Sequence, residues 1–537
     1  MAIINTNIFC YGATQAGMAF AAYAVETGAR CLIGEWTRHI GGTSAGGLGI
    51  GDWSTRRWGK TKRVNVKIGE NLGFNDRREM KNVSANQMRA AMDAVYLASP
   101  LIDVRTNIRL KKVYKHPGTA RISMVELESG DLIVADYFHD ASYEYDLARL
   151  AGVRLRSGRE GQAQFNAPVE YEDRNGKMST PGWNPSRHEN EDHTLVDTRG
   201  DRFWFATQAP QRGLNTGDAT AANQANGWRF ELFRRAKGEP GGLPWVKPSD
   251  WTQADDRRIL DLIYRSQAPN SPQSTGAAGS LFPFGGSVRA VDTTVARQSG
   301  RYGTNGCDLP GAFTNGWCEA SYAERERIVE RAAWITMGSH WVTANHSDVA
   351  RSRRESMQTL LLPDDTFQEI YTLFPGWPPQ FYIRDGGGIW GQFMMTAEHL
   401  RKDPSTRRAW NFEDSVATGG YHADIHTPYY YNTPEGYARK EGSIGYRERP
   451  NYGVPLRCFL PHPGQCSNLT VSWGASGDAI WRSSWRMEQT VACGAQSCGM
   501  LTALAFNNGS LSDRALADVP FPELKARLAA ENAVTTV

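Results

Sequence analysis

The chain has 537 residues, 40% of them apolar, which is enough for a large core and roughly two to four domains of about 150 residues. Its 60 basic and 57 acidic side chains leave a formal charge of +3, which excludes a dedicated nucleic-acid or anionic-membrane surface and favours a small-molecule ligand. No run reaches the roughly 20 apolar residues of a membrane span, and no secretory signal pattern opens the sequence. The eight cysteines form no CxxC pair, so we expect a protein of the reducing cytoplasm.

The first 35 residues predict a strand, a glycine turn, a helix and a second strand. The strands are expected at residues 3–10 and 30–35, with the turn at 12–17 and an Ala-rich helix at 18–26 between them. This is the order of a dinucleotide-binding unit, in which an acid about 20 residues after the turn binds ribose hydroxyls. Glu35 ends the second strand and stands at that position.

The turn has the sequence YGATQAG, residues 11–17. Gly12 permits a sharp bend, Gly17 lets the helix approach the strand, and the N-terminus of the helix offers N–H groups and a positive dipole end to a pyrophosphate. Thr14 stands where the usual pattern has glycine. Either the pyrophosphate sits slightly differently here, or the hydroxyl of Thr14 takes part in binding it.

Further elements follow along the chain. We expect a helix at 87–98, three strands within 109–139 with a hairpin at Ser129 and Gly130, and helices at 319–341, 490–506 and 520–531. Residues 151–300 are rich in Gly, Pro, Asn and Trp and give no clear periodicity. No HExxH, Walker or GxSxG motif is present, which excludes the metalloprotease, nucleotide hydrolase and serine hydrolase readings of the sequence.

Several segments together resemble the family of FAD-dependent oxidoreductases. The first are YGATQAG, the acid of GEW, and HIGGTSAGGLGIGD at residues 39–52, where the matching positions are Gly41, Gly42, Gly46, Gly47, Leu48, Gly49 and Asp52. Later matches are HDASYEYDLARLAGV from residue 139, the region of Asn305 and Asp308, DSVATGGYHADIH ending at His426, and SSWRMEQTVACGAQSCG ending at Gly499. In related flavoproteins the last segment runs beside the isoalloxazine ring and enters a helix that faces its pyrimidine edge.

The resemblance implies an α/β fold with a discontinuous Rossmann-type FAD-binding domain and an inserted α+β substrate domain. We expect the FAD-binding domain at residues 1–150 and 410–510, the substrate domain at 151–409 and a helical tail at 511–537. FAD is the expected cofactor, with no metal. The residues expected to hold it are Gly12, Thr14, Gln15, Ala16, Gly17, Glu35, Trp36, His39, Gly41, Gly42, Gly47, Leu48, Asp140, Ala141, Arg486, Met487 and Gln496.

The candidate catalytic residues are His426, His422 and Asp424. A neutral imidazole suits general-base work, so His426 is the first choice, with Asp424 to orient it and His422 as the second choice. The alternative is that this histidine only ties a loop to the core. In the same way, His39 either packs or bonds covalently to the flavin.

Other polar and aromatic groups also leave two interpretations. Glu144 and Asp146 either bind a substrate hydroxyl or cap a helix at Leu147. Tyr429, Tyr430 and Tyr431 with Trp390 form either a substrate wall or core packing.

Two departures from the family pattern bear on the substrate. RDGGGIWG has Gly386, Gly387 and Gly388 where the family commonly has arginines, and Asp478 and Ala479 stand where a histidine is common. The resemblance then implies that a cationic contact and a proton carrier are missing, and that a strongly anionic substrate is not expected.

The leading functional hypothesis is oxidation of a small organic substrate at a C–OH or C–N carbon by hydride transfer to flavin N5. One alternative uses the same flavin for hydroxylation or for a lyase or isomerase reaction. Another, from a different class, is a flavin-carrying partner subunit without catalysis. In each case the expected partner is a small molecule, not a nucleic acid or a membrane.

Overall fold

A computed structural model gives the fold of the chain. It describes residues 1–49, 51, 57–74, 79–80, 82–160, 171–172, 178–179, 223–235, 240–265, 288–290, 301–304, 308–309, 314, 316–368, 374–426, 430–432, 438–440, 444–445, 451–507 and 514–537.

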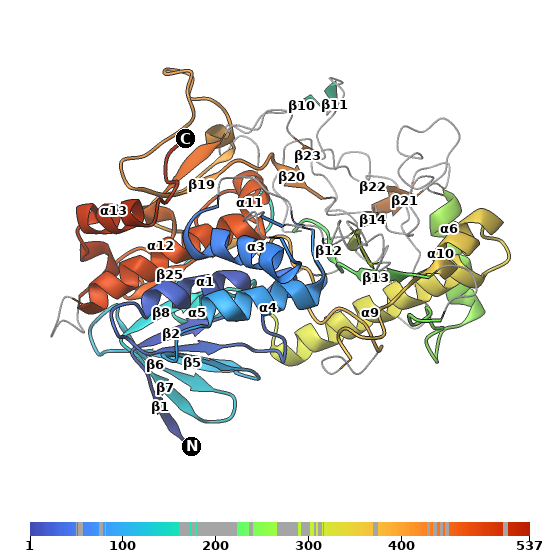
Figure 1. Cartoon of the computed structure of the whole chain (residues 1–537), viewed down its shortest axis with the longest axis horizontal. Coiled ribbons are helices and arrows are strands. Elements are labelled where there is room, and N and C mark those ends of the chain that lie inside the picture. The colour runs from blue at the N-terminus through green and yellow to red at the C-terminus, as the bar shows by residue number, and fades with distance from the viewer. Residues whose placement is uncertain are drawn as a thin grey trace.

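A five-stranded parallel sheet lies in the half of the molecule that holds the two termini (Figure 1). Its strands, in spatial order, are β25 (Leu469–Val471), β8 (Tyr137–Asp140), β2 (Ile8–Tyr11), β3 (Cys31–Gly34) and β4 (Ile102–Arg105). Every residue of β2, β3, β8 and β25 is buried, as expected where both faces of a parallel sheet are covered. The predicted Rossmann-type sheet is therefore confirmed.

Helices from both ends of the chain cover this sheet together. Helix α1 (Gln15–Ala24) packs along α12 (Glu488–Asn507), and Figure 1 shows the blue and the red helix side by side. A Cβ added at Gly499 would come within 2.3 Å of the carbonyl oxygen of Phe20, so glycine allows this close crossing. Beside the pair lie α2 (Gly42–Ala45), α3 (Gly59–Asn71) and α4 (Ala85–Tyr96).

The strand predicted at residues 3–10 belongs to two sheets. Its first part, β1 (Ile3–Asn5), joins a second sheet in the order β1, β7 (Leu132–Val134), β6 (Ile122–Leu127), β5 (Leu110–Lys115). The predicted hairpin connects β6 to β7, with Gly130 at φ +85°. Residues 109–139 thus hold four strands instead of three, because β8 leaves this sheet and enters the parallel one.

The middle of the chain forms a separate end of the molecule. There α6 (Gln253–Arg265), α9 (Tyr322–Asn345) and α10 (Arg351–Thr359) lie opposite the termini (Figure 1). An antiparallel sheet has the order β14 (Val288–Ala290), β15 (Arg301–Thr304), β13 (Glu231–Arg234), β17 (Leu360–Leu361). The domain boundaries stay a prediction, although β25 and α12 supply the FAD-type sheet with a strand and a helix from the last part of the chain.

Short elements complete the chain. Paired strands are β9 (Leu155–Arg156) with β18 (Gly388–Ile389), β10 (Tyr171–Glu172) with β11 (Met178–Ser179), β12 (Asn226–Gly227) with β16 (Asp308–Leu309), β19 (Ser415–Gly419) with β24 (Tyr452–Pro455), β20 (Asp424–Ile425) with β23 (Ile444–Gly445), and β21 (Tyr430–Asn432) with β22 (Ala438–Lys440). The remaining helices are α5 (Asp146–Leu150), α11 (Ala479–Trp485) and α13 (Phe521–Ala530), with 3-10 turns η4 (Ala397–Leu400), η5 (Leu456–Cys458) and η6 (Leu516–Asp518). None of the described helices combines the length and the apolar character needed to cross a bilayer.

Candidate functional site

The glycine turn after β2 is shaped by close contacts with the loop after β8. Gly12 has φ +101°, and a Cβ there would lie 2.6 Å from the backbone nitrogen of Ser142. A Cβ on Gly17 would lie 2.0 Å from the carbonyl oxygen of Gly12. The two glycines therefore let strand, turn and helix meet. As in any α-helix, the first N–H groups of α1 have no partners inside the helix.

Thr14 caps α1. Its hydroxyl accepts a hydrogen bond from the backbone N–H of Gly17 at 3.2 Å and donates one to the carbonyl of Ala141 at 2.9 Å. The hydroxyl thus has two partners within the protein, and it ties the helix to the end of β8.

Glu35 lies directly beyond β3 and is buried. Its Oε2 accepts from the backbone N–H of Ala13 at 3.0 Å, and its Oε1 accepts from the N–H and the hydroxyl of Thr37. Burial raises the pKa of Glu35 above its ordinary value, although these donors act in the opposite direction. Since Oε2 accepts one hydrogen bond, from the backbone N–H of Ala13, it retains capacity for a ligand hydroxyl.

A cavity of about 420 Å³ opens at the residues that follow Glu35. It is lined by Trp36, Thr37, Arg38, His39, Asn107, Arg109, Trp317, Glu326, Val329, Glu330, Pro379, Gln380 and Phe381. His39 is itself buried, with Nε2 at 2.8 Å from the carbonyl oxygen of Gly42. Burial lowers the pKa of His39 to about 4, so this imidazole is neutral at neutral pH.

The glycine-rich segment after His39 packs closely against the middle of the chain. Gly41 is the N-cap residue of α2 and has φ +107°. A Cβ at Gly46 would lie 2.6 Å from Cβ of Gln380, and one at Gly47 would lie 2.2 Å from the carbonyl oxygen of Arg229. Through these two glycines the segment packs directly against Gln380 and Arg229 from the middle of the chain.

The N-terminus of α12 approaches α2 from the other side. Glu488 Oε1 accepts a hydrogen bond from the hydroxyl of Tyr143 at 2.8 Å, and that hydroxyl accepts one from the N–H of Thr43 at 2.8 Å. Burial raises the pKa of Glu488 to about 7, against the effect of the neighbouring hydroxyl groups. The segment before α12 therefore lies next to the glycine-rich segment.

Three arginines converge on Tyr382 nearby, and all four side chains are buried. Arg486 Nη1 donates to the phenol oxygen at 3.0 Å, and Arg229 and Arg384 place their guanidinium groups 4.6 and 4.8 Å from the ring centre. Although burial opposes it, these three cations lower the pKa of Tyr382 below its ordinary value. We call Arg229, Tyr382, Arg384 and Arg486 the arginine–tyrosine cluster.

Strand β12 explains how distant segments meet in this cluster. Gly227 exchanges two backbone hydrogen bonds with Tyr382, at 2.8 and 3.2 Å, on one side and pairs with Asp308 of β16 on the other. Asn226 accepts from the backbone N–H of Arg384 at 2.9 Å. The short strand thus brings together its own segment, the segment of Tyr382 and Arg384, and Asp308.

His426 closes the cluster with two carboxylates. Its Nδ1 lies 2.5 Å from Asp308 Oδ2, and its Nε2 lies 3.3 Å from Asp424 Oδ2. Asp308 also pairs with Arg384 at 2.5 Å, and Asp424 with Arg486 at 3.2 Å. Against the effect of burial, these partners hold the pKa of both carboxyl groups well below the usual range.

The profile of a family described as FAD dependent oxidoreductase matches residues 7–528. The chain belongs to this family. FAD is its cofactor, and the resemblance drawn from the sequence is confirmed. Within the described part of the chain, no group of three His, Cys, Asp or Glu side chains is arranged to hold a metal ion.

Several solved structures share a smaller part of the fold. PqsL of P. aeruginosa, in complex with 2-aminobenzoylacetate, is 12% identical over 28% of this chain and 47% of its own, with a TM-score of 0.20. OxyS anhydrotetracycline hydroxylase from Streptomyces rimosus is 13% identical over 30% and 36%, and THI4 of Thermovibrio ammonificans is 18% identical over 29% and 66%, both with TM-scores of 0.22. This chain therefore spans about half the length of PqsL in that match. A search of curated proteins found no match.

The geometry of this FAD-dependent oxidoreductase fits its cofactor. The N-terminus of α1 presents N–H groups to a pyrophosphate, Glu35 has an oxygen available to a ribose hydroxyl, and the 420 Å³ cavity opens at the residues that follow Glu35. The glycine-rich segment meets the backbone of Arg229 on one side and, through Thr43 and Tyr143, the N-terminus of α12 on another. Gln15, Ala16, Trp36, Gly42 and Leu48 stay predicted cofactor contacts.

Some expected contacts have other roles. Gln496 lies farther along α12, where its side chain accepts from the N–H of Thr61 at 2.8 Å and donates to the carbonyl of Trp58, so it holds α3 and lies away from the cofactor course. Asp140 accepts from Ser142 and Ala148 and shapes its own loop, while Ala141 receives the hydroxyl of Thr14. Met487 is buried at the start of α12.

The other candidates are distributed around the site. His422 is buried, with its ring 4.3 Å from that of Tyr421 and tilted by 36°, four residues before His426. Trp390 lies under the guanidinium groups of Arg154 and Arg156, at 4.1 and 4.8 Å, and not in the cluster. Tyr429 and Asn305 lie outside the described residues, as do the side chains of Tyr430 and Tyr431.

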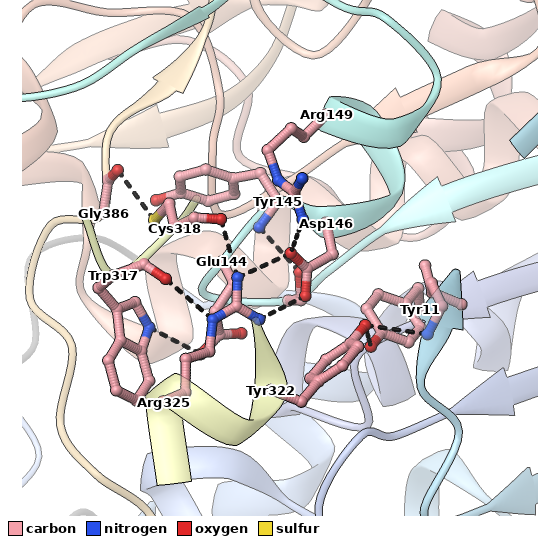
Figure 2. Close-up of polar contacts among 12 residues, drawn as sticks. Tyr11, Glu144, Tyr145, Asp146, Arg149, Trp317, Cys318, Tyr322, Arg325 and Gly386 are labelled. Carbon is pink, nitrogen blue, oxygen red and sulfur yellow. Dashed lines mark hydrogen bonds and ion pairs between the residues drawn. The ribbon is translucent and has the colours of Figure 1, made fainter. Parts of the chain in front are cut away.

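Glu144 and Asp146 neither cap a helix nor reach the cluster. Figure 2 shows Arg325 of α9 inserted between them and the carbonyls of Trp317 and Cys318. Arg325 donates to both oxygens of Asp146, at 2.6 and 2.8 Å, with both residues fully buried. This ion pair fastens the inserted region to the loop after β8.

The glycine run in RDGGGIWG also has a packing role. A Cβ on Gly386 would lie 2.5 Å from Sγ of Cys318, and one on Gly387 would lie 1.9 Å from the carbonyl oxygen of Arg156. The run lets three segments approach closely, and its first residue, Arg384, supplies a cation to the cluster. Arg229, Arg384 and Arg486 nevertheless come together at Tyr382 from distant positions, and the absence of a cationic contact to the substrate stays a prediction.

Proposed function

We propose that this FAD-dependent oxidoreductase oxidises a small organic substrate at a C–OH or C–N carbon, with hydride transfer to the flavin. We place the reaction site at the arginine–tyrosine cluster, where the backbone of Arg229 contacts Gly47. The observation that carries the proposal is the cluster itself, a buried set of cations, carboxylates and a phenol beside the expected flavin course. Such concentrations of perturbed ionisable groups mark functional sites more often than purely structural ones.

The bound FAD supplies a two-electron acceptor for the substrate C–H bond. The chain has to supply three other things, which are a position for the substrate, exclusion of water and an acceptor for the proton that leaves the oxygen or nitrogen. The arginine–tyrosine cluster is buried and polar, so it suits all three tasks. Its guanidinium groups orient the substrate heteroatom by hydrogen bonding.

The charges of the cluster favour a neutral substrate group at this point. Two of the three guanidinium groups pair with carboxylates, Arg384 with Asp308 and Arg486 with Asp424. Because these carboxylates already neutralise the two guanidinium groups, an alcohol or amine fits this point better than a strong anion, as the sequence leads us to expect.

His426 has a supporting part in this proposal. Because both ring nitrogens face carboxylate oxygens, neither offers a free lone pair to a substrate. It links Asp308 to Asp424 and so fixes the two carboxylates that hold Arg384 and Arg486. The same argument leaves Asp424 as a positioning residue.

Anaerobic reduction of the bound flavin tests the proposal. The purified holoprotein is mixed with a panel of small primary and secondary alcohols, primary amines, and the corresponding 2-hydroxy and 2-amino acids, and the visible flavin band is followed. Bleaching by an alcohol or amine, with release of the carbonyl product, is the expected result. If no compound bleaches the flavin while dithionite does, oxidation of C–OH or C–N is wrong for this chain.

The same panel separates the alternatives. Product formation with the flavin oxidised throughout, and with no electron acceptor present, identifies a lyase or isomerase reaction. A product that gains an oxygen atom, and only when a reductant is supplied, identifies hydroxylation.

A further inference from the structure

Glu488 is a buried carboxyl at the start of α12, and only one of its two oxygens has a hydrogen-bond donor. Its side chain is 7% exposed, and its Oε1 accepts from the hydroxyl of Tyr143 at 2.8 Å. Its Oε2 is buried and has no hydrogen-bond partner in the described part of the chain. Burial raises the pKa of Glu488 to about 7, against the effect of the hydroxyls of Tyr143, Ser44 and Thr43. An ionised Glu488 is therefore costly, because its second oxygen is desolvated without a donor.

Close contacts connect this carboxyl to the N-terminus of α1, where a pyrophosphate is expected. The Tyr143 hydroxyl that donates to Glu488 also accepts from the backbone N–H of Thr43 at 2.8 Å. A Cβ on Gly42 would lie 2.4 Å from that hydroxyl and 3.2 Å from Cα of Thr14, the N-cap residue of α1. The hydroxyl of Tyr143 and the backbone of Gly42 thus connect Glu488 to the helix end that suits the negative charges of FAD.

A second connection runs through Ser44 of α2. Its hydroxyl donates to Oε1 of Gln15, the first residue of α1, at 2.7 Å. The same hydroxyl lies close enough to Glu488 to act on its pKa. The first residues of α1, α2 and α12 therefore meet at one junction, and Glu488 is the carboxyl at that junction.

The other groups around Glu488 keep their charge near neutral pH. Helices α1 and α2 carry no charged side chain. Burial raises the pKa of Tyr143 well above its ordinary value, and it lowers the pKa of His39, which hydrogen-bonds a carbonyl of α2, to about 4. Arg486, two residues before Glu488, is paired with Asp424. A titration near neutral pH at this junction therefore belongs to Glu488.

Bound FAD changes the charge at the junction. Its pyrophosphate is negatively charged, and a like charge nearby disfavours the ionised form of a carboxyl. FAD should therefore raise the pKa of Glu488 above its value in the apoprotein. At a pH where the carboxyl is ionised in the apoprotein, it then binds a proton in the loaded protein.

We propose that Glu488 takes up one proton from solution when FAD binds and keeps it while FAD is bound. The proton forms an O–H bond with Oε2, since Oε1 already accepts from Tyr143. No bond of the cofactor changes and no electron is transferred, so the step balances with one proton from water. The inference rests on FAD as the cofactor and is independent of the substrate oxidation proposed above.

The affinity for FAD at different pH values tests this without any substrate. Holoprotein is diluted and equilibrated, and free FAD is separated by ultrafiltration and measured by its fluorescence. Glu488→Gln fixes the side chain in an uncharged form of nearly the same shape. Its Kd should equal that of the wild type at about pH 6 and be about tenfold lower or more at about pH 8.5, where the wild type has to take up a proton.

Comparing the two proteins isolates Glu488, because every other titrating group contributes equally to both and cancels in the ratio of the Kd values. A ratio that does not change with pH would overturn the inference. So would a variant that binds FAD more weakly than the wild type at about pH 8.5.

Glu144→Gln is the matched control. Burial raises the pKa of Glu144 to about 8, but this carboxyl lies beside Arg325 and accepts from the indole N–H of Trp317. The Kd of Glu144→Gln should follow that of the wild type at each pH. If this variant instead reproduced the behaviour of Glu488→Gln, the proton would belong to another carboxyl and the inference would be wrong.

Proton uptake can also be counted directly, which covers the case in which Glu488→Gln does not fold. In weakly buffered solution at about pH 7.5, a pH-indicator dye follows the mixing of apoprotein with FAD. The wild type should take up most of one proton per FAD. Tyr143→Phe removes the hydroxyl that donates to Oε1, which raises the pKa of Glu488 in the apoprotein, so this variant should take up fewer protons. No uptake by the wild type, or equal uptake by both proteins, contradicts the inference.

Discussion

The hydroxyl of Thr14 holds two elements together at the edge of the parallel sheet. It accepts from Gly17 in the first turn of α1 and donates to Ala141 after β8. Thr14→Val keeps the shape and removes both hydrogen bonds, so we expect the free energy of unfolding to fall by about 1 to 2 kcal/mol. Denaturant unfolding of the holoprotein measures this. Thr14→Ser, which retains the hydroxyl, should lose much less, and equal losses in the two variants would exclude the cap.

Glu144 gives the stability a dependence on pH. Burial is the main cause that raises its pKa to about 8, although Arg325 opposes it. A carboxyl whose pKa is higher in the folded state does not lower the free energy of unfolding at pH values below its ordinary pKa of about 4.3. It lowers that free energy increasingly as the pH rises towards about 8, and by a constant amount above that. The wild type should therefore lose stability from this group between pH 4.5 and 8.

Glu144→Gln isolates this effect, because glutamine keeps the shape and an acceptor for the indole N–H of Trp317. Relative to the wild type, the variant should become more stable by up to about 3 to 5 kcal/mol between pH 5 and pH 9. Chemical unfolding at both pH values measures the change. Glu128→Gln, at an exposed position, is the control and should show almost no pH-dependent difference.

At the scale of elements, the pair of Arg325 and Asp146 fastens α9 to α5. Both side chains are buried, so removing one leaves an uncompensated charge. Arg325→Met should lower the free energy of unfolding by about 3 to 5 kcal/mol, and the double variant with Asp146→Asn should recover part of that loss. Arg351→Met breaks an exposed pair with Glu355 on α10 and should cost less than about 0.5 kcal/mol. If Arg325→Met lost as little free energy of unfolding as Arg351→Met, the ion pair would not hold α9 to α5.

The glycine run before β18 makes a second element-scale prediction. Gly387 has φ +114°, and a Cβ there would overlap the carbonyl oxygen of Arg156 at 1.9 Å. Gly387→Ala should therefore displace β9 from β18 and cost at least about 3 kcal/mol, or prevent recovery of folded protein. Gly464→Ala is the matched control, since a Cβ there meets nothing within 4 Å. Soluble yield and thermal unfolding of the two variants measure the difference.

Local patterns were enough for some of these elements and not for others. The strand, turn, helix, strand and acid of residues 3–35 were predictable because each signal lies within a few residues of the next. The long helices were predicted to within a few residues, at 488–507 against 490–506 and at 322–345 against 319–341. The split of residues 3–10 into β1 and β2 was missed, because a switch between two sheets leaves no change in apolar pattern.

The site was harder to predict because its parts come from distant segments. Arg229, Tyr382 and Asp308 meet through the two-residue strand β12, which has no periodicity to detect. The resemblance did indicate Arg486, Asp424, His426 and Asp308, since these stand in matched segments. It also assigned Gln496 to the cofactor, because a motif gives the residues of a helix without saying which neighbour each one faces.

At the scale of the whole molecule, the two ends of the chain build one unit around the middle. Strand β25 extends the sheet that begins with β2, and α12 lies along α1. The buried hydrophobic core is continuous from Ile8 through Trp228 to Leu528. Together with the Arg325 ion pair, this continuity makes separate unfolding of the inserted region unfavourable. The chain should behave as a single cooperative unit, in spite of its length.

Calorimetry of the apoprotein and the FAD-loaded protein tests that cooperativity. We expect one unfolding transition in each, with a higher Tm in FAD, because FAD binds the folded chain only and adds about 2.7 kcal/mol at 100 times its Kd. Flavin mononucleotide lacks the adenosine half that Glu35 and the 420 Å³ cavity suit, so at equal concentration it should raise the Tm less. Two separate transitions, of which FAD moves only one, would show that the inserted region folds independently and that the buried contacts to α9 do not couple it to the sheet.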